Sequence, residues 1–330
     1  MELLYRLSDA FGPSGNEEQI AKMVKDEIKD YVDEVYTDAL GNLIAHKRGE
    51  GKKFMLAAHM DEIGIIVTYV EKNGFVRFAP VGGLDCYSMV NRQVVFENGT
   101  VGVVTYEEKI DIKKELNFSK MYIDIGAVDG EDAEKMVSVG DTAVYCANMK
   151  SAGKRVFGKA LDNRTGVYAL IETAKRIKES PFDIYYVFTT QEEIGLRGAK
   201  TSAFAINPDY ALAIDVTVTG DTPNCPLSCV KLGEGACIKI MDKSVVASPV
   251  MRRALQSCAA DKSIAVQNEI LTFGGTDAGA IHTVCDGAIS GAISIPLRYI
   301  HTPCEMADMG DIDAVVNLTA EFLKEDYFAK

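Results

Sequence analysis

Short apolar segments that alternate with helical patterns constrain this chain more than any other feature, and the alternation breaks off once. Residues 54–58 and 184–190 are nearly continuous apolar runs, which are typical of strands covered on both faces by helices. Between residues 62 and 148 helical spacing nearly vanishes, and hairpin signals such as Asn73-Gly74 take its place. We therefore expect an α/β fold, in which a doubly wound domain with a mixed sheet is interrupted by a small β-rich, barrel-like insert.

The expected domain boundaries follow from the same change of pattern. The α/β domain is discontinuous, with residues 1–61 and 149–330, and the insert occupies residues 62–148. In the α/β domain, apolar spacing predicts helices at 3–11, 20–31, 165–178, 249–261 and 311–324, and strands at 32–37, 43–47, 54–58, 184–190, 210–216, 264–273 and 288–295. One short helix is expected in the insert, at 131–137. Ser14 and Glu17 form the pattern of a capping box at the start of the second helix.

Composition excludes several classes of function. Aspartate and glutamate total 48 against 35 lysine and arginine, and the formal net charge of −13 argues against nucleic acid and anionic membranes as partners. No apolar run approaches the ~20 residues that span a bilayer, and the first residues lack the pattern of a secretory signal. We therefore expect a cytoplasmic protein whose eight scattered cysteines are reduced thiols.

The four histidines differ in their sequence context. His59 follows the apolar run 54–58, so it lies at the carboxyl end of a buried strand, where open α/β sheets place their ligands. Asp61, two residues further on, could hold the second nitrogen of that imidazole. His46 lies at a basic strand end and is expected on the surface, whereas His282 falls within a helical pattern and is expected to be a packing residue.

Acidic residues and a further histidine collect at the ends of other predicted strands and at the start of one helix. They are Asp162, Glu192, Glu193, Asp215 and His301. Any one carboxylate in such a place is more often a helix cap or a solvated group than a ligand. Together with His59, however, they form a set of oxygen and nitrogen donors that suits zinc, cobalt or manganese, and a shared carboxylate could bridge two ions.

Two stretches of chain would decide the shape of such a site. Adjacent residues of a regular strand point to opposite faces, so Glu192 and Glu193 can both face one site only if the chain leaves the strand there, and Gly195 makes that departure plausible. The run Gly274-Gly275-Thr276 follows an apolar strand, and its glycines allow close backbone approach. This run is a candidate for the lining of a substrate pocket, with a tight structural turn as the alternative.

Five short motifs carry a resemblance to a known family. They are Ala58-His59-Met60-Asp61-Glu62, Leu161-Asp162-Asn163-Arg164, Gln191-Glu192-Glu193-Ile194-Gly195, Ala213-Ile214-Asp215 and Arg298-Tyr299-Ile300-His301-Thr302-Pro303. With these motifs in order across nearly the whole chain, the sequence resembles the dinuclear metallo-aminopeptidases of the tetrahedral (TET) type, which include glutamyl and deblocking aminopeptidases. The resemblance implies an enzyme that removes N-terminal residues from short peptides with two divalent ions per chain, zinc or cobalt, with manganese as an alternative.

The resemblance also implies a role for each member of the donor set. The two ions would be held by His59 and Asp215, by Glu193 and His301, and by Asp162 as the bridge between them. Glu192 would be the general base that activates water, and Asp61 would orient the first histidine. The peptide bond after Asp162 would be cis, as it often is in the fold that this sequence resembles.

The β-rich insert receives a function only from the resemblance, which implies that it pairs subunits into homodimers, six of which close into a homododecamer. Two other functions stay open. One is a glucanase-type glycoside hydrolase, which needs two carboxyl groups ~5–9.5 Å apart across a sugar bond; adjacent Glu192 and Glu193 fit a base and a ligand better. The other is a non-catalytic assembly subunit, which would lack ligands, whereas all of them are present.

Overall fold

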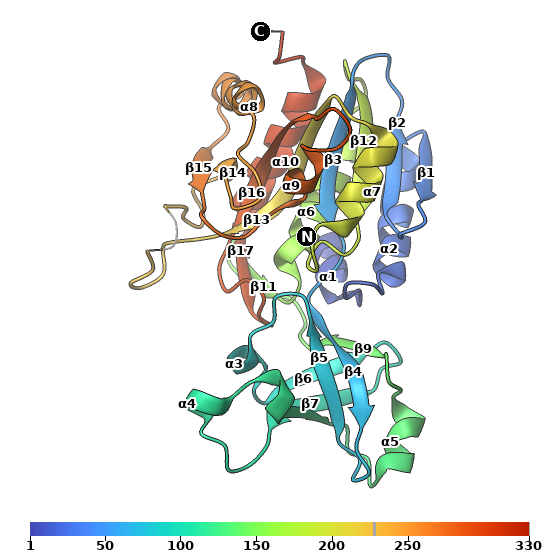
Figure 1. Cartoon of the computed structure of the whole chain (residues 1–330). Helices are drawn as coiled ribbons and strands as arrows, with labels where there is room; N and C mark the ends of the chain where they lie inside the picture. Colours follow the sequence, from blue (N-terminus) through green and yellow to red (C-terminus); the bar gives the residue numbers. More distant parts are fainter. Residues whose placement is uncertain (227–228, 330) are drawn as a thin grey trace.

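The central sheet is mixed, as the sequence predicts. The computed structural model describes residues 1–226 and 229–329. Its largest sheet has eight strands in the order β1-β2-β12-β3-β13-β16-β14-β15 (Figure 1). They span Glu34–Thr37 (β1), Leu43–Lys47 (β2), Asp183–Thr189 (β12), Lys53–His59 (β3), Tyr210–Val218 (β13), Ile289–Leu297 (β16), Ala236–Met241 (β14) and Val266–Ile270 (β15). Strands β12, β3, β13 and β16 run parallel to one another, whereas β2 and β14 are antiparallel to their neighbours in that group.

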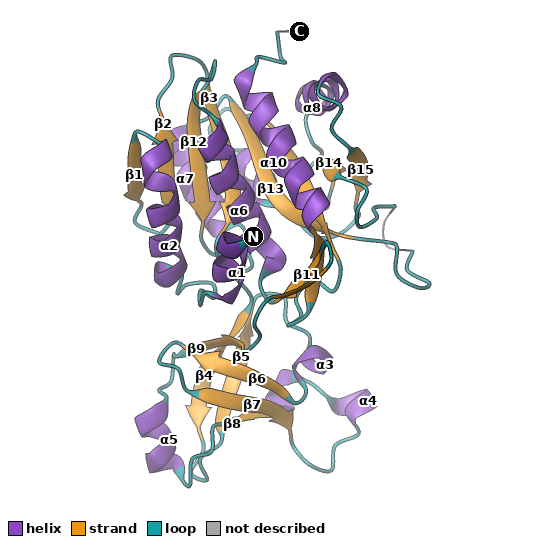
Figure 2. Ribbon diagram, turned by 180° about the vertical axis from the view of Figure 1, so that it is seen from behind, coloured by secondary structure: helices purple, strands orange, loops and turns teal. Residues whose placement is uncertain are grey.

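Helices cover both faces of this sheet, and strand residues alternate between the two layers. One layer contains α1 (Glu2–Asp9), α2 (Glu18–Ile28), α6 (Leu161–Arg176), α8 (Pro249–Asp261) and α10 (Met309–Lys324) (Figure 2). The other layer contains α7 (Arg197–Ile206) and α9 (Asp277–Ile281) (Figure 1). In β3, Phe54, Leu56 and Ala58 face the first layer, whereas Met55 and Ala57 face the second. A strand buried on both faces has a continuous apolar sequence, which is why this strand was predictable.

The insert is a closed barrel with a hydrophobic core of its own, which confirms the predicted barrel-like fold. Its strands follow the order β4-β5-β8-β7-β6-β9. They span Gly64–Val70 (β4), Val76–Val81 (β5), Met121–Asp124 (β8), Val101–Tyr106 (β7), Arg92–Phe96 (β6) and Thr142–Tyr145 (β9), with short helices at Cys86–Met89 (α3), Ile112–Glu115 (α4) and Gly130–Met136 (α5) and a 3₁₀ turn at Phe118–Lys120. Side chains such as Ile65, Val104 and Ile123 fill the barrel. It projects from one end of the α/β domain (Figure 1).

A small antiparallel sheet joins two segments that lie far apart in the sequence. Its strands are β10 (Lys150–Ala152), β11 (Arg155–Gly158) and β17 (Glu305–Asp308), in that order. Gly158 pairs with Glu305, so the chain that enters α6 runs beside the chain that follows β16 (Figure 1). This pairing brings the start of α6 next to the loop between β16 and β17.

The capping box predicted at Ser14 and Glu17 does not form. Helix α2 begins one residue after Glu17, whose side chain makes no capping hydrogen bond. The Ser14 hydroxyl instead donates to Oδ2 of Asp61 at 2.6 Å, and Oε1 of Glu17 accepts from the backbone N–H of Gln191 at 3.1 Å. Both side chains therefore support the carboxyl edge of the main sheet rather than the helix that follows them.

Other predictions of local structure also need correction. Helix α7 and strand β14 were missed, as were α3 and α4 in the insert, and the strand expected at 264–273 is confined to Val266–Ile270. His46 is half-buried rather than on the surface. Its Nε2 lies 2.7 Å from Oδ1 of Asp183, and its ring stacks on Tyr185 with the ring centroids 4.0 Å apart. The pairing of β2 with β12 produces both contacts.

Within the described residues, no helix combines the length and the apolar character needed to cross a membrane. All eight cysteines are free thiols, as the sequence predicts. The cytoplasmic location stays a prediction.

Candidate metal centre

The side chains singled out from the sequence meet at one edge of the main sheet. They come from the end of β3 (His59), the segment after β12 (Glu192 and Glu193), β13 (Asp215), the start of α6 (Asp162) and the loop between β16 and β17 (His301). Because β3, β12 and β13 are parallel, their carboxyl ends lie side by side, which is where α/β sheets bind their ligands. The pairing of β11 with β17 brings in the last two elements.

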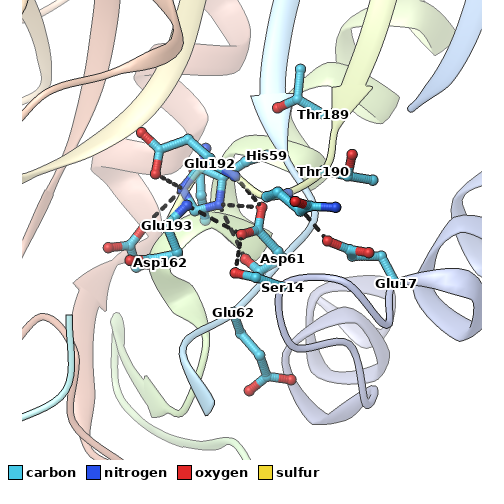
Figure 3. A network of polar contacts seen from close by, with 12 residues as sticks. Ser14, Glu17, His59, Asp61, Glu62, Asp162, Thr189, Thr190, Glu192 and Glu193 are labelled. Carbon is cyan, nitrogen blue, oxygen red and sulfur yellow. Dashed lines mark hydrogen bonds and ion pairs between the residues drawn. The ribbon is translucent and has the colours of Figure 1, made fainter. Parts of the chain in front are cut away.

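Two groups of candidate ligands share one carboxylate. His59, Asp162 and Asp215 form the first ligand group, and Asp162, Glu193 and His301 form the second; within each group the ligand atoms lie within 4.8 Å of one another. Nε2 of His59 is 3.1 Å from Oδ1 of Asp162, and Nε2 of His301 is 3.4 Å from Oδ2 of the same carboxylate. The outer carboxylates complete the groups, with Asp215 3.6 Å from His59 and Glu193 3.1 Å from His301. Figure 3 shows Asp162 and Glu193 beside His59.

The electrostatics of the site favour positive charge at both imidazoles. Burial alone would lower the pKa of His59, but carboxylates led by Glu192 outweigh burial and raise that pKa well above its ordinary value. Burial also opposes protonation of His301, yet Asp162 and Glu193 raise its pKa to about 12. An environment that stabilises cations at two adjacent points, and offers nitrogen and oxygen donors at each, fits a pair of divalent metal ions.

The chain leaves the strand before the two adjacent glutamates, which explains how both can face the site. Gln191 has a left-handed backbone, with φ +54°. The backbone N–H groups of Glu192 and Glu193 then donate to Oδ1 and Oδ2 of Asp61, at 3.0 and 3.2 Å. Gly195 also has a positive φ, +124°. The predicted departure therefore occurs, but it begins at Gln191, four residues before the glycine that suggested it.

Asp61 is completely buried, and it supports the site through both its main chain and its side chain. Nδ1 of His59 lies 3.1 Å from the backbone carbonyl of Asp61 and 3.5 Å from its Oδ1. The predicted contact with the imidazole is therefore made mainly by the main chain. The carboxylate accepts hydrogen bonds from Ser14, Glu192 and Glu193 instead, and so fixes the turn that carries the two glutamates.

Glu305 was not predicted, although it joins the two segments that carry Asp162 and His301. Its Oε2 accepts from the backbone N–H of Asp162 at 3.0 Å, and its Oε1 accepts from the backbone N–H of His301 at 2.8 Å. Glu305 is buried. The peptide bond between Asp162 and Asn163 is cis, as the sequence resemblance implied.

A cavity of about 590 Å³ opens over both ligand groups. Its lining includes the five candidate ligands, Glu192, the apolar residues Val216, Leu271 and Phe273, and the run Gly274, Gly275 and Thr276. The glycine-rich run therefore lies beside the candidate ligands.

Lys239 and Asp242 also line the cavity, and the sequence did not identify them because β14 itself was missed. His282 directly follows α9 and is half-buried, with its Nδ1 3.0 Å from the carbonyl of Ala278, and it does not line this cavity.

Comparison with known proteins decides the family. The model of the M42 glutamyl aminopeptidase family matches residues 41–318 of this chain. The chain belongs to the M42 family. A putative aminopeptidase of Acetivibrio thermocellus is 51% identical to it over 97% of both chains. This M42 enzyme is a metallo-aminopeptidase.

Solved structures of TET peptidases share the complete fold. A TET aminopeptidase from a marine sediment archaeon of the Thaumarchaeota is 33% identical to this chain. The two structures superpose with a TM-score of 0.95 over 99% of this chain and 97% of that one. The TET1 peptidase of Pyrococcus horikoshii is 35% identical to this chain, and its structure superposes with a TM-score of 0.90 over 98% of this chain and 99% of that one. That peptidase is described as able to assemble into a tetrahedron or a large octahedral shell.

In this M42 aminopeptidase, Asp61→Asn should destabilise the fold more than Ser14→Ala. An amide leaves one of the N–H groups of Glu192 and Glu193 without an acceptor, which costs about 1–3 kcal/mol, whereas loss of the Ser14 hydroxyl removes one ordinary hydrogen bond worth about 0.5–1.5 kcal/mol. Urea unfolding of the chelator-treated proteins measures both changes. Equal midpoints for the two variants would contradict the role given to the Asp61 carboxylate.

Proposed function

We propose that this enzyme removes N-terminal residues from short peptides with two divalent metal ions, zinc or cobalt, with manganese as an alternative. The observation that supports the proposal best is the carboxylate shared by the two ligand groups. Asp162 directs one oxygen to each imidazole, as a carboxylate that bridges two cations must. In this proposal the first ion is held by His59 and Asp215, and the second by Glu193 and His301. Imidazole and carboxylate donors suit these metals.

When bound, a pair of such ions polarises the scissile carbonyl and lowers the pKa of a water molecule toward neutrality. Glu192 is the proposed general base. It belongs to neither ligand group, yet it lines the cavity, and its Oε2 lies 4.0 Å from Nε2 of His59. From this position Glu192 would take the proton of the attacking water and pass it to the leaving amine.

The substrate would lie along the glycine-rich side of the cavity. Gly274 has φ +70° and open space where a Cβ would be, so the backbone of 274–276 can approach a peptide closely. Leu271 and Phe273 add an apolar wall. We therefore propose that Gly274, Gly275 and Thr276 contact the N-terminal part of the peptide.

The reaction class can be tested with a panel of aminoacyl-anilides and short peptides. We expect release of the N-terminal residue, loss of turnover after treatment with a chelator, and recovery on addition of zinc or cobalt. In the proposed mechanism the bound metal ions polarise the scissile carbonyl, and the imidazoles and carboxylates around them cannot do so in their place. A soluble β-glucan in the same panel tests the glycoside hydrolase alternative. Chelator-resistant activity, or hydrolysis of the glucan alone, would contradict the proposal.

Glu192→Gln and Glu193→Gln form a matched pair, because the two residues are adjacent and the chemical change is the same. Glu192→Gln should keep both ions and lower kcat by at least ~100-fold, the usual effect of losing a general base. Glu193→Gln should instead weaken metal binding, since an amide is a poorer ligand than a carboxylate. Elemental analysis and steady-state kinetics separate the two effects. Exchanged phenotypes would reverse the roles of base and ligand.

We also propose that the barrel pairs chains into homodimers and that six dimers form a homododecamer. The assembly of the Pyrococcus horikoshii peptidase supports this, and so do the large apolar side chains that the barrel exposes. They are Tyr69, Tyr87, Val101, Val103, Val128 and Val139. A closed shell would admit unfolded peptides and exclude folded proteins.

The mass in solution tests the proposed assembly. Static light scattering of the metal-loaded protein at micromolar concentration should report a mass of twelve chains of 35.9 kDa each. A stable dimer would overturn the twelve-chain assembly and leave the pairing intact. A fully active monomer would contradict both parts of the proposal.

A further inference from the structure

His301 is held less firmly by its own surroundings than the other histidine of the site. Its side chain is 31% exposed, whereas that of His59 is 2% exposed. It lies in the loop between β16 and β17, where its backbone is left-handed with φ +64°. Glu305 fixes the backbone N–H of His301 but does not set the direction of the ring. The ring therefore needs a second contact if Nε2 is to face Glu193 and Asp162.

That contact comes from the inserted barrel. Gly82 and Gly83 form a turn directly after β5. The backbone N–H of Leu84 closes this turn by donating a hydrogen bond to the carbonyl of Gly82 at 3.0 Å. The carbonyl oxygen of Gly83 lies 3.0 Å from Nδ1 of His301. A carbonyl can only accept a hydrogen bond, so Nδ1 must carry the proton in this contact, and Nε2 is left as the ligand atom.

The same turn packs so closely against the second ligand group that side chains are excluded. A Cβ on Gly83 would lie 2.6 Å from both Nδ1 and Cε1 of His301. A Cβ on Gly82 would lie 2.9 Å from Cγ2 of Ile63 and 3.2 Å from Cβ of Glu193, and its φ of +84° disfavours any side chain. The turn thus touches the two ligands that the second group does not share with the first.

We propose that the Gly82-Gly83 turn is a positioning element of the second metal subsite, so that the inserted barrel completes the metal centre as well as serving in assembly. The inference rests on the proposed dinuclear site. The first subsite needs no such help, because Asp61, in the same segment as His59, holds the corresponding nitrogen. A shift of the barrel relative to the α/β domain would therefore act on one ion and not on the other.

Gly83→Ala tests the proposal, with Gly99→Ala as its control. Gly99 lies at a hairpin tip of the same barrel, and no atom lies within 4 Å of the position that a Cβ would take. Its φ of +88° means that the added Cβ strains the backbone there, so this control perturbs the barrel without touching the site. Equilibrium dialysis against zinc, followed by elemental analysis, gives the two dissociation constants. We expect wild type and Gly99→Ala to bind two ions with the same dissociation constants. In Gly83→Ala the dissociation constant of the first ion should be unchanged, whereas that of the second should rise at least about tenfold, as it does when other contacts to metal-bound histidines are lost.

The possible outcomes separate this inference from the proposed function. Wild-type affinity for both ions in Gly83→Ala would overturn the inference and leave the dinuclear site intact. Equal weakening of both ions in that variant would also overturn it. A wild-type protein that binds fewer than two ions would overturn the dinuclear site and this inference with it.

A second measurement covers the case in which Gly83→Ala folds poorly. If the added methyl group meets the imidazole, Gly83→Ala should lower the urea midpoint of the chelator-treated protein, and the loss should disappear in a His301→Ala background, where the ring is absent. The same loss in both backgrounds would show that the turn acts on the fold rather than on His301, and would overturn the proposal.

Discussion

The carboxylate of Asp162 lies between two imidazoles, and the rest of the site is arranged around that contact. One oxygen faces His59 at 3.1 Å and the other faces His301 at 3.4 Å. To face two imidazoles at once, the carboxylate needs a fixed backbone. Glu305 fixes that backbone by accepting hydrogen bonds from the backbone N–H groups of Asp162 and His301. The pairing of β11 with β17 in the small sheet brings together the two segments that carry Asp162 and His301.

Each imidazole is held at Nδ1 by a main-chain carbonyl, but the two carbonyls have different origins. His59 is held by Asp61, two residues further along the same segment. His301 is held by Gly83, which belongs to the barrel. Such outer contacts set the tautomer and the direction of a histidine that binds metal. In the proposed dinuclear centre, one half therefore lies within the α/β domain, and the other half is completed by a contact from the barrel.

The parts that leave a local signal were predictable from the sequence, and the parts that depend on distant backbone groups were not. A buried strand such as β3 has a continuous apolar sequence, and a histidine at its end marks the functional edge. The Ser14 pattern was misread because the capping box is a local rule, whereas the actual partner, Asp61, lies on another element. Gly83 acts through its main-chain carbonyl, which has no side-chain signature. The carboxylate of Glu305 accepts from main-chain N–H groups of two distant segments, and no local pattern marks such partners. Strand β14 was missed because a buried lysine interrupts its apolar sequence.

The most direct test of the shared carboxylate is anomalous X-ray diffraction from crystals of the zinc-loaded enzyme, recorded on both sides of the zinc absorption edge. The account predicts two peaks per chain, about 3.5–4 Å apart, one beside His59 and the other beside His301, with an oxygen of Asp162 bonded to each. A single peak, or two peaks of which only one lies within bonding distance of Asp162, would contradict it.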